Sequence, residues 1–429
     1  MDSVETLAKA AHAAAGVLAG LSVEAKNAAL DAMAAALADG AEAVFAANAE
    51  DVAAARAENL SAPLLARLSL DRKKLAGLVE GLRALRALPD PVGRALMRTE
   101  LAPGLVLTRR TCPIGTIGVV FESRPDALVQ ISSLCLKSGN ACLLKGGREA
   151  LRTNRALFAA LSGAAAAAGI PPGWAALLET REDVSAMLAL DRDIDLLIPR
   201  GSNEFVRKMQ ESTRIPVMGH SAGICHLYVD RAADAAMAVR IAVDAKTQAP
   251  ATCNSIETLL VHREIAPAFL PALAAAMAEK GVELRADAGT APFLPGSKPA
   301  TDADWDEEYL SPVLSVKAVG SLREAVAHVN EHGSRHTDAI VTEDEAAAER
   351  FLASVDSADA FWNCSTRFAD GFRFGLGAEV GISTGKLHAR GPVGLEGLTT
   401  YRWLLRGHGE TVAPFAEGTA RFTHKPLPV

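Results

Sequence analysis

The amino-acid sequence predicts an α/β protein whose parallel sheets are covered by helices on both faces. From Gly115 onward, short apolar runs alternate with longer segments of helical spacing, which is the pattern of repeated strand and helix units. The chain also has 429 residues, more than the length at which one hydrophobic core keeps growing. We therefore expect two doubly wound domains, each with its own core.

Helices precede the first strand. Residues 1–88 are rich in Ala, Leu, Glu and Lys at helical spacing. Ser22 can cap a helix that stops near Gly40, and Pro89 and Pro91 end another. This segment is expected to be ordered and helical.

Two series of strands and helices follow. The first is predicted to have strands at 115–123, 140–147, 174–180 and 193–200 and helices at 125–139, 148–169, 182–190 and 202–210. After a strand at 223–230 and a helix at 232–248, the second has strands at 255–262, 282–287, 314–320, 338–344 and 359–365 and helices at 264–280, 321–333 and 345–356. The division between domains is predicted at residue 250.

Composition and charge narrow the class of protein. The hydrophobic fraction of 49% and the charged fraction of 22% are ordinary for a globular enzyme. A formal net charge of -7 without a dense Lys/Arg block argues against binding to nucleic acid or anionic lipid. The start MDSVETLAKA does not read as a secretory signal, and no stretch reads as a membrane span. We expect a cytoplasmic protein.

The cysteines do not form a recognisable metal or disulfide framework. The six are Cys112, Cys135, Cys142, Cys225, Cys253 and Cys364. No C-x-x-C pair occurs among them, so neither a structural zinc site nor disulfides are expected. Most have apolar neighbours, as in LCLKSGNACLL, and are expected to be buried as small hydrophobic residues. Cys253, in TQAPATCNSIETLLVH, has mostly small polar neighbours.

Cys253 also lies at the predicted domain junction, where ligand sites are common. A nucleophile and a packing residue are both open interpretations of this thiol. Lys145 ends a predicted strand in LLKGGRE, where it either meets a ribose or phosphate or is a solvated turn lysine. In LLIPRGSNEF, Gly201 and Ser202 begin a helix that favours an anion, although Ser202 can equally be an N-cap.

Two further segments carry charges at loop positions. Arg124 in FESRPDA can clamp a carboxylate or phosphate, or it can form a surface pair with Asp126. The segment EVGISTGKLHARGPVG holds Lys386, His388 and Arg390 among glycines. It is interpreted either as a loop over an anionic substrate or as a glycine-rich turn.

Several motifs together resemble one family. They are IGVVFESRPDA, LKSGNACLLKGG, IPRGSNEFV, TQAPATCNSIETLL, EEYLSPVLSV and RFGLGAEVGISTGKLHARGPVGLEGLTTYRW. The chain resembles the γ-glutamyl phosphate reductases, which are members of the aldehyde dehydrogenase superfamily, from the helical start almost to the C-terminus. The last of these motifs is highly specific.

The resemblance implies an aldehyde dehydrogenase-like fold with two doubly wound parallel-sheet domains and a small oligomerisation element. Residues 1–250 would form the cofactor-binding domain, with a hairpin at 99–113 as part of the oligomerisation element. Residues 251–395 would form the catalytic domain, and residues 396–429 a C-terminal oligomerisation tail. A homo-oligomer is expected.

Site residues also follow from the resemblance. It makes Cys253 the catalytic nucleophile, assigns Lys145, Gly201 and Ser202 to the cofactor, and places Glu308 on the nicotinamide ribose. The cofactor implied is NADPH/NADP+. KGGRE lacks the KPAE glutamate of many relatives, and Arg148 or Arg152 would meet a 2′-phosphate.

The groups that bind and polarise the substrate are less defined. The backbone N–H of Cys253 is the expected oxyanion donor. Many aldehyde dehydrogenases add an Asn side chain, whereas here Ser123, Arg124 or Asn254 would take that role. Arg124, together with Lys386 and His388, is assigned to substrate binding.

The implied activity is NADPH-dependent reduction of L-glutamyl 5-phosphate to L-glutamate 5-semialdehyde plus phosphate through a cysteine thioester. This is the second step of proline biosynthesis from glutamate. The substrate is labile, so a transient contact with glutamate 5-kinase is expected.

A departure from hydrolytic aldehyde dehydrogenases agrees with this activity. The stretch PVMGHSAGICH contains no carboxylate where those enzymes carry a water-activating glutamate. A coenzyme A-acylating dehydrogenase would also lack that base and is the main alternative. A non-enzymatic scaffold is the other, but it would have no need to retain Cys253, Lys145 and the ISTGKLHARGP segment.

Overall fold

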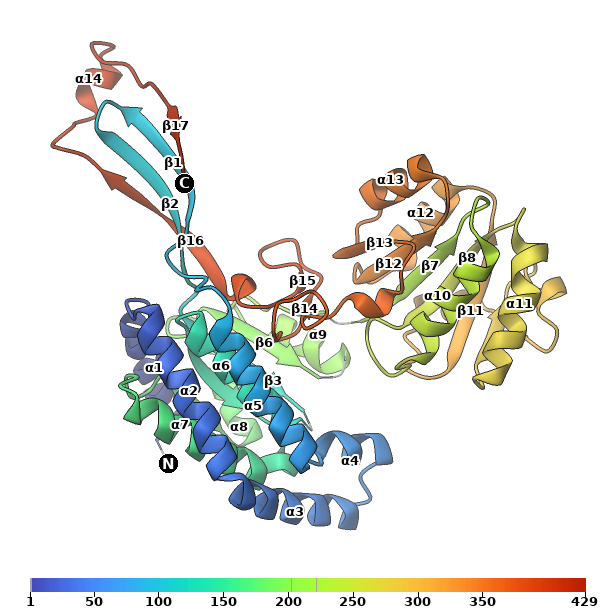
Figure 1. Cartoon of the computed structure of the whole chain (residues 1–429), viewed down its shortest axis with the longest axis horizontal. Helices are drawn as coiled ribbons and strands as arrows, with labels where there is room; N and C mark the ends of the chain where they lie inside the picture. The colour runs from blue at the N-terminus through green and yellow to red at the C-terminus, as the bar shows by residue number, and fades with distance from the viewer. Residues whose placement is uncertain (1, 123, 202, 221) are drawn as a thin grey trace.

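The computed structural model of the protein describes residues 2–122, 124–201, 203–220 and 222–429. Two α/β units carry most of the chain, and a β-sheet arm projects from them (Figure 1). The predicted α/β class is therefore confirmed. Within the described residues, no helix is long and apolar enough to cross a membrane.

Five helices form the N-terminal segment. They are α1 (Val4–Leu18), α2 (Val23–Asp39), α3 (Ala41–Ala57), α4 (Ala62–Leu68) and α5 (Arg72–Ala87). The Ser22 hydroxyl accepts the Ala25 N–H at 3.2 Å and so caps α2, which ends before Gly40 as predicted. The prediction that Pro89 ends a helix is also confirmed, since α5 ends two residues earlier at Ala87.

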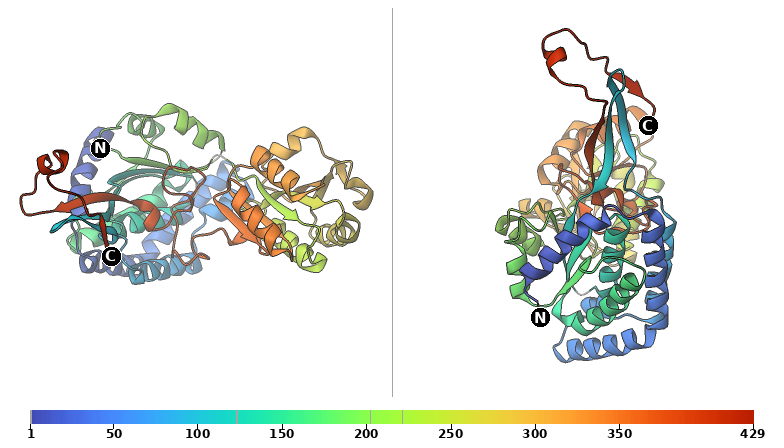
Figure 2. Two further views of the ribbon diagram at one scale, coloured as in Figure 1. Left: turned by 90° about the horizontal axis from the view of Figure 1, so that it is seen from above. Right: turned by 90° about the vertical axis from the view of Figure 1, so that its left-hand side faces the viewer.

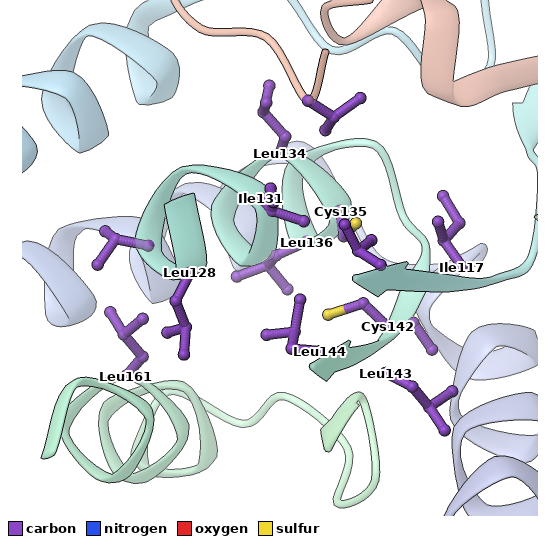
Figure 3. Close-up of a cluster of buried hydrophobic side chains, with 14 of the residues drawn as sticks. Ile117, Leu128, Ile131, Leu134, Cys135, Leu136, Cys142, Leu143, Leu144 and Leu161 are labelled. Carbon is purple, nitrogen blue, oxygen red and sulfur yellow. The ribbon is translucent and has the colours of Figure 1, made fainter. Parts of the chain in front are cut away.

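The first unit contains a four-stranded parallel sheet in the order β5-β4-β3-β6. Its strands are β3 (Thr116–Phe121), β4 (Ala141–Lys145), β5 (Ala175–Leu178) and β6 (Leu196–Arg200), and its helices are α6 (Pro125–Lys137), η1 (Arg148–Ala150), α7 (Leu151–Ala167), α8 (Arg181–Met187) and α9 (Asn203–Ser212). Cys135 and Cys142 lie among leucines in its core, as Figure 3 shows, which confirms their interpretation as buried apolar residues.

The second unit contains a seven-stranded parallel sheet in the order β10-β9-β11-β8-β7-β12-β13. Its strands are β7 (Cys225–Val229), β8 (Ile256–His262), β9 (Glu283–Ala286), β10 (Lys298–Pro299), β11 (Val313–Val319), β12 (Thr337–Val341) and β13 (Asp359–Trp362). Its helices are α10 (Ala235–Thr247), α11 (Ala266–Glu279), η2 (Ala291–Phe293), η3 (Asp302–Asp306), α12 (Leu322–His332), α13 (Glu345–Ser354) and η4 (Thr366–Phe368). Separate apolar clusters under α10–α11 and α12–α13 show that helices cover both faces.

The boundary between the two units differs from the one predicted. β7 pairs with β8 and β12, so the second unit begins before residue 225 and not at residue 251. After β13 the chain returns, and Val380, Val393 and Leu398 pack into the first core. The sequence pattern shows where a strand occurs, but sheet membership depends on pairing that the pattern does not encode.

The arm is an antiparallel sheet in the order β16-β2-β1-β17. It consists of β1 (Ala95–Ala102), β2 (Leu105–Pro113), β16 (Thr399–Arg406) and β17 (Lys425–Leu427), with α14 (Ala413–Ala416) at its tip. The hairpin expected at 99–113 is present but begins earlier, at Ala95. The right-hand view of Figure 2 shows this sheet projecting beyond the first unit.

Candidate active site

A cleft of about 1170 Å³ lies between the two units. From the first unit it is lined by the carboxyl end of β6 and the start of α9, and from the second by the turn before β8. β3 has β4 on one side and β6 on the other, so the strand order reverses beside β6. Ligands of open parallel sheets bind at such a reversal.

Cys253 lines this cleft from the turn between α10 and β8. The Thr252 hydroxyl donates to Ala249 O at 2.7 Å, and the Ser255 N–H donates to Thr252 O at 2.9 Å. The side chain of Cys253 is half-buried. Local hydrogen bonds thus hold the thiol at the cleft wall, partly exposed to a ligand.

The adjacent segment of the second unit packs closely on the backbone of Cys253. The Cys225 thiol donates to Cys253 O at 3.2 Å, and burial raises the pKa of Cys225 well above its ordinary value, so it remains a thiol. A Cβ atom added at Gly223 would lie 2.1 Å from the same oxygen. Only glycine fits there, because the Cys253 carbonyl occupies the space.

Two imidazoles lie beside Cys253. The Nδ1 atom of His220 is 2.8 Å from Ile382 O and must carry the proton, because a carbonyl oxygen only accepts. The Nε2 lone pair of His220 is therefore available. His336 is fully buried, and its Nε2 has no hydrogen-bond partner among the described residues. One ligand atom from each of His220, Cys253 and His336 lies within 4.8 Å of the other two.

Two arginines give the cleft positive charge near the thiol. Arg200 ends β6, opposite Phe121 of β3, and its Nη1 is buried without a hydrogen-bond partner among the described residues. Arg367 in η4 is only 9% exposed, and its Nε donates to Gln248 Oε1 at 2.9 Å.

Burial lowers the pKa of both guanidinium groups, whereas the negative charge of a Cys253 thiolate raises it. The charge of Arg124 also lowers the pKa of Arg200, and Glu379 opposes that effect. Since an ordinary arginine pKa is above 12, both groups stay charged. Their charges are close enough to act on the thiol.

Four predicted site residues line the same cleft as Cys253, namely Arg124, Gly201, Asn254 and Glu308. The amide of Asn203 on α9 donates to Glu308 Oε2 at 2.6 Å and so joins the two units. The Arg124 guanidinium is 3.9 Å from Asp126, which is the surface pair left open by the sequence. Ser123 and Ser202 lie outside the described residues.

Lys145 ends β4 at the same sheet edge but does not line the cleft. Its ammonium donates to Gly146 O at 2.5 Å, and the side chain is buried. Burial lowers its pKa, while the Glu149 carboxylate raises it.

Asn254, next to Cys253, links the Cys253 turn to the segment around η4 by hydrogen bonds. Its amide donates to Ala369 O at 2.7 Å, and its own carbonyl accepts the Thr366 hydroxyl at 2.7 Å. The side-chain oxygen is buried without a partner among the described residues. Asn254 therefore fixes the loop that carries Arg367.

Lys386 and His388 do not line the cleft. Lys386 forms an ion pair with Asp356 at 2.8 Å, and the His388 Nε2 is 2.7 Å from Thr399 O. Both side chains are bound within the chain. Their predicted contact with substrate has no support from this arrangement.

Sequence reasoning missed four residues of the cleft or its wall, namely Arg200, Arg367, His220 and His336. Arg200 directly precedes the Gly-Ser pair that we singled out, so its position at a strand end was visible in the sequence. The other three come from distant segments, and only the fold brings them to Cys253.

The fold and the site define an α/β enzyme that works through a cysteine, with a cleft between two parallel-sheet units. Comparisons with known proteins agree. A sequence model of the aldehyde dehydrogenase family matches residues 1–293 and 291–380. The chain belongs to the aldehyde dehydrogenase family and, within it, to the γ-glutamyl phosphate reductases.

Full-length relatives support this placement. Gamma-glutamyl phosphate reductases of Pelotomaculum thermopropionicum and a Cyanothece species are 56% and 55% identical to the chain, covering 100% and 98% of it and 98% and 97% of those proteins. The crystal structure of gamma-glutamyl phosphate reductase from Thermotoga maritima matches with a TM-score of 0.93 at 37% identity, over 96% of this chain and 100% of that one. The resemblance drawn from the motifs is confirmed.

A more distant structure shares only the fold. An acetylating aldehyde dehydrogenase from Geobacillus thermoglucosidasius matches with a TM-score of 0.67 at 18% identity, over 95% of this chain and 97% of that one. The predicted aldehyde dehydrogenase-like architecture is confirmed by both structures.

Proposed function

We propose that the chain reduces L-glutamyl 5-phosphate to L-glutamate 5-semialdehyde and phosphate, the second step of proline biosynthesis from glutamate. The observation that carries the proposal is a half-buried thiol, Cys253, in one cleft with two arginines, Arg367, which is buried, and Arg200, whose Nη1 is buried. Full-length relatives named for this activity support the choice of substrate.

The thiolate of Cys253 attacks the acyl carbon of the substrate. A carbon–sulfur bond forms, the bond from that carbon to the phosphate oxygen breaks, and the phosphate leaves with the electron pair. Arg200 and Arg367 stabilise the charge on the leaving phosphate, because guanidinium groups match phosphate oxygens and stay charged. A thioester remains on Cys253.

The carbonyl oxygen of that thioester gains negative charge during attack and reduction. The backbone N–H of Cys253 is the donor that we propose for it. Asn254 fits a positioning role better than that of a second donor, since its amide already donates to Ala369 O. Ser123 lies outside the described residues and remains a proposed donor.

We propose that residues in the cleft, together with Lys145 at the same sheet edge, hold the nicotinamide cofactor. A Cβ atom at Gly201 would lie 3.0 Å from Phe205 and 3.1 Å from Glu122, so a side chain would crowd the turn before α9. We propose that Gly201 and Ser202 hold the phosphates at the start of α9 and that Lys145 and Glu308 hold ribose hydroxyls. When bound, the reduced nicotinamide supplies the hydride that converts the thioester to the aldehyde level. Cys253 then leaves as a thiolate.

We propose NADPH as the specific cofactor. Arg148 is exposed at the start of the helical segment after β4 and pairs with Glu58 at 2.9 Å, and Arg152 pairs with Glu50 at 3.1 Å. A 2′-phosphate carries more charge than either carboxylate and would compete for both guanidinium groups. The ratio of kcat/KM for NADPH to that for NADH checks this assignment, and it should fall in an Arg148→Ala Arg152→Ala variant.

The reverse reaction provides the test of the activity. The enzyme is mixed with the cyclic form of glutamate 5-semialdehyde and NADP+, and reduced cofactor is followed by absorbance with and without inorganic phosphate. Reduction that depends on phosphate, and that is lost in Cys253→Ala, supports the reductase. Reduction without phosphate would indicate a hydrolytic dehydrogenase, and reduction only with coenzyme A would indicate an acylating one.

The proposed function also has a cellular location and an assembly. We propose a cytoplasmic enzyme that assembles as a homo-oligomer through the arm formed by β1, β2, β16 and β17. A transient contact with glutamate 5-kinase would shorten the exposure of its labile acyl phosphate to water. Cross-linking of the two enzymes with and without substrate would test that contact.

A further inference from the structure

We infer that His220, Cys253 and His336 form a binding site for a thiophilic divalent cation of the zinc type. The three residues come from separate segments: His220 lies between α9 and β7, Cys253 in the turn before β8, and His336 directly before β12. One ligand atom from each lies within 4.8 Å of the other two. The binding site itself does not depend on the proposed reaction.

The donor set matches the chemistry of this class of ion. One thiolate and two imidazole nitrogens are ligands that Zn²⁺ prefers, whereas Mg²⁺ and Ca²⁺ prefer oxygen. Because the cleft borders Cys253, the fourth position of a tetrahedral ion would be open to water or an anion. This is the arrangement of an open site and not of a closed structural one.

The second nitrogen of each imidazole supports the inference. Nδ1 of His220 is held by Ile382 O at 2.8 Å, and Nδ1 of His336 is 2.8 Å from the Thr337 hydroxyl. Metal-binding histidines usually have their other nitrogen bonded in this way, which fixes the tautomer and the direction of the ring. The Thr337 hydroxyl donates to Asp359 Oδ2 at 3.4 Å, so it accepts from Nδ1–H of His336. Both Nε2 atoms then have a lone pair to donate.

The burial of His336 supports the metal site independently of the distances between the three ligand atoms. This ring is fully buried, yet its Nε2 has no hydrogen-bond partner among the described residues. A buried polar atom without a partner is costly, and such atoms are rare unless a ligand satisfies them. A cation bonded to Cys253 and His220 would satisfy it.

Binding of the cation releases one proton and transfers no electrons. The Cys253 thiol loses its proton to solvent, the sulfur and the two nitrogens donate electron pairs to the cation, and no electron is transferred. Cys225, whose sulfur is 3.7 Å from His336 Nδ1, donates a hydrogen bond to Cys253 O and is not one of the three ligands. With its sulfur bound, Cys253 cannot attack an acyl carbon, so the cation would inhibit the enzyme reversibly; this consequence alone rests on the proposed function.

Cobalt is the direct probe, since Co²⁺ takes zinc sites and reports a thiolate ligand by a charge-transfer band in the near ultraviolet. We expect the full-length enzyme, stripped with a chelator, to bind one Co²⁺ with that band and to lose it when Zn²⁺ is added. Cys253→Ser should abolish the band, whereas Cys364→Ser, the matched control at another half-buried thiol, should keep it. A band that survives in Cys253→Ser would overturn the inference.

Imidazole variants test the other two ligands. His220→Asn keeps a donor to Ile382 O but removes the Nε2 lone pair, and it should weaken Co²⁺ binding at least about tenfold. His336→Gln should do the same, with His332→Ala on α12 as the unaffected control. Because His336 is buried and its variant can fail to fold, His220→Asn decides alone: unchanged Co²⁺ affinity in that variant contradicts the site.

Inhibition is measured separately from binding. Micromolar Zn²⁺ should stop the phosphate-dependent reverse reaction and slow alkylation of Cys253 by iodoacetamide, and a chelator should restore both. If Co²⁺ binds as described but no phosphate-dependent reaction exists, the proposed function fails and the metal site stands. If the reaction proceeds but no Co²⁺ binds to the three residues, the metal site fails and the reductase stands.

Discussion

At the residue scale, the Arg200 guanidinium has hydrogen-bonding capacity that the described part of the chain does not use. One of its nitrogens is buried without a partner among the described residues, so its position is explained by a ligand better than by packing. A hydrogen bond to a charged group contributes about 1.5 to 3 kcal/mol.

We therefore predict that Arg200→Gln raises the KM for inorganic phosphate in the reverse assay by about 10- to 150-fold. The midpoint of thermal unfolding should change little. Arg207→Gln, at an exposed position on α9, is the matched control and should leave that KM unchanged. A normal KM for phosphate in Arg200→Gln would remove this residue from the phosphate site.

Asp359 at the start of β13 sets a dependence of stability on pH. Burial raises the pKa of this carboxyl to about 6 from 3.8, although Thr337 and Arg390 oppose the shift. Below pH 3.8 the group is protonated in both the folded and the unfolded chain. Between pH 3.8 and about 6 only the unfolded chain ionises, so rising pH favours unfolding, and above about pH 6 the full cost applies.

Asp359→Asn should remove this cost, because an amide stays neutral at every pH. We predict a gain of about 2 to 3 kcal/mol in the free energy of unfolding at pH 8 and almost none near pH 4. Thermal unfolding followed across that range measures the difference. Asp302→Asn, an exposed carboxyl in η3, is the control, and an equal gain at both pH values in Asp359→Asn would contradict the shift.

At the scale of elements, the turn that carries Cys253 depends on its neighbour before β7. A methyl group at Gly223 would overlap the Cys253 carbonyl, with a separation of only 2.1 Å. To remove this overlap, the backbone at Cys253 or at residue 223 must move. The structural cost therefore falls directly on Cys253, the proposed nucleophile.

Gly223→Ala should lower kcat by at least about tenfold, since misplacing a reacting group by about 1 Å can cost 100-fold. Far-ultraviolet circular dichroism should remain that of the parent enzyme. Gly219→Ala is the matched control, because its nearest neighbour would lie at an ordinary contact distance of 3.6 Å. Equal kcat values for the two variants would show that the turn yields without moving the thiol.

Elements were largely predictable from the sequence because their signals are local. The Ser22 cap, the stop at Pro89 and the apolar run of β3 each act within a few residues. The sheet to which β7 belongs was not predictable, since that depends on its partners β8 and β12. The same limit applies to His336 at the site, because nothing in its own segment points to Cys253.

At the scale of the whole molecule, the arm presents an unpaired edge. β16 pairs with β2 on one side only, and its outward residues Tyr401, Trp403 and Leu405 are 50%, 51% and 56% exposed. Long exposed edges with aromatic side chains tend to pair with another chain. Arg109 stacks on Tyr401, with its guanidinium carbon 5.0 Å from the ring centroid, and so keeps this face in place.

We predict that Trp403→Asp with Leu405→Asp reduces the size of the assembly, as measured by sedimentation velocity, and leaves thermal unfolding of both units largely unchanged. Arg402→Asp, also exposed on β16 but on its opposite face, is the matched control. An assembly of unchanged size in the double variant would show that subunits do not join through this face.

The return of the chain to the first core after β13 has a consequence for synthesis. Residues 225–362 hold the complete second sheet, whereas the first core still lacks Val380, Val393 and Leu398 when that sheet has been made. On the ribosome we therefore expect the second unit to complete its core before the first, against the usual order from the N-terminus. The core of the first unit stays incomplete until the segment from Val380 to Leu398 has been synthesised.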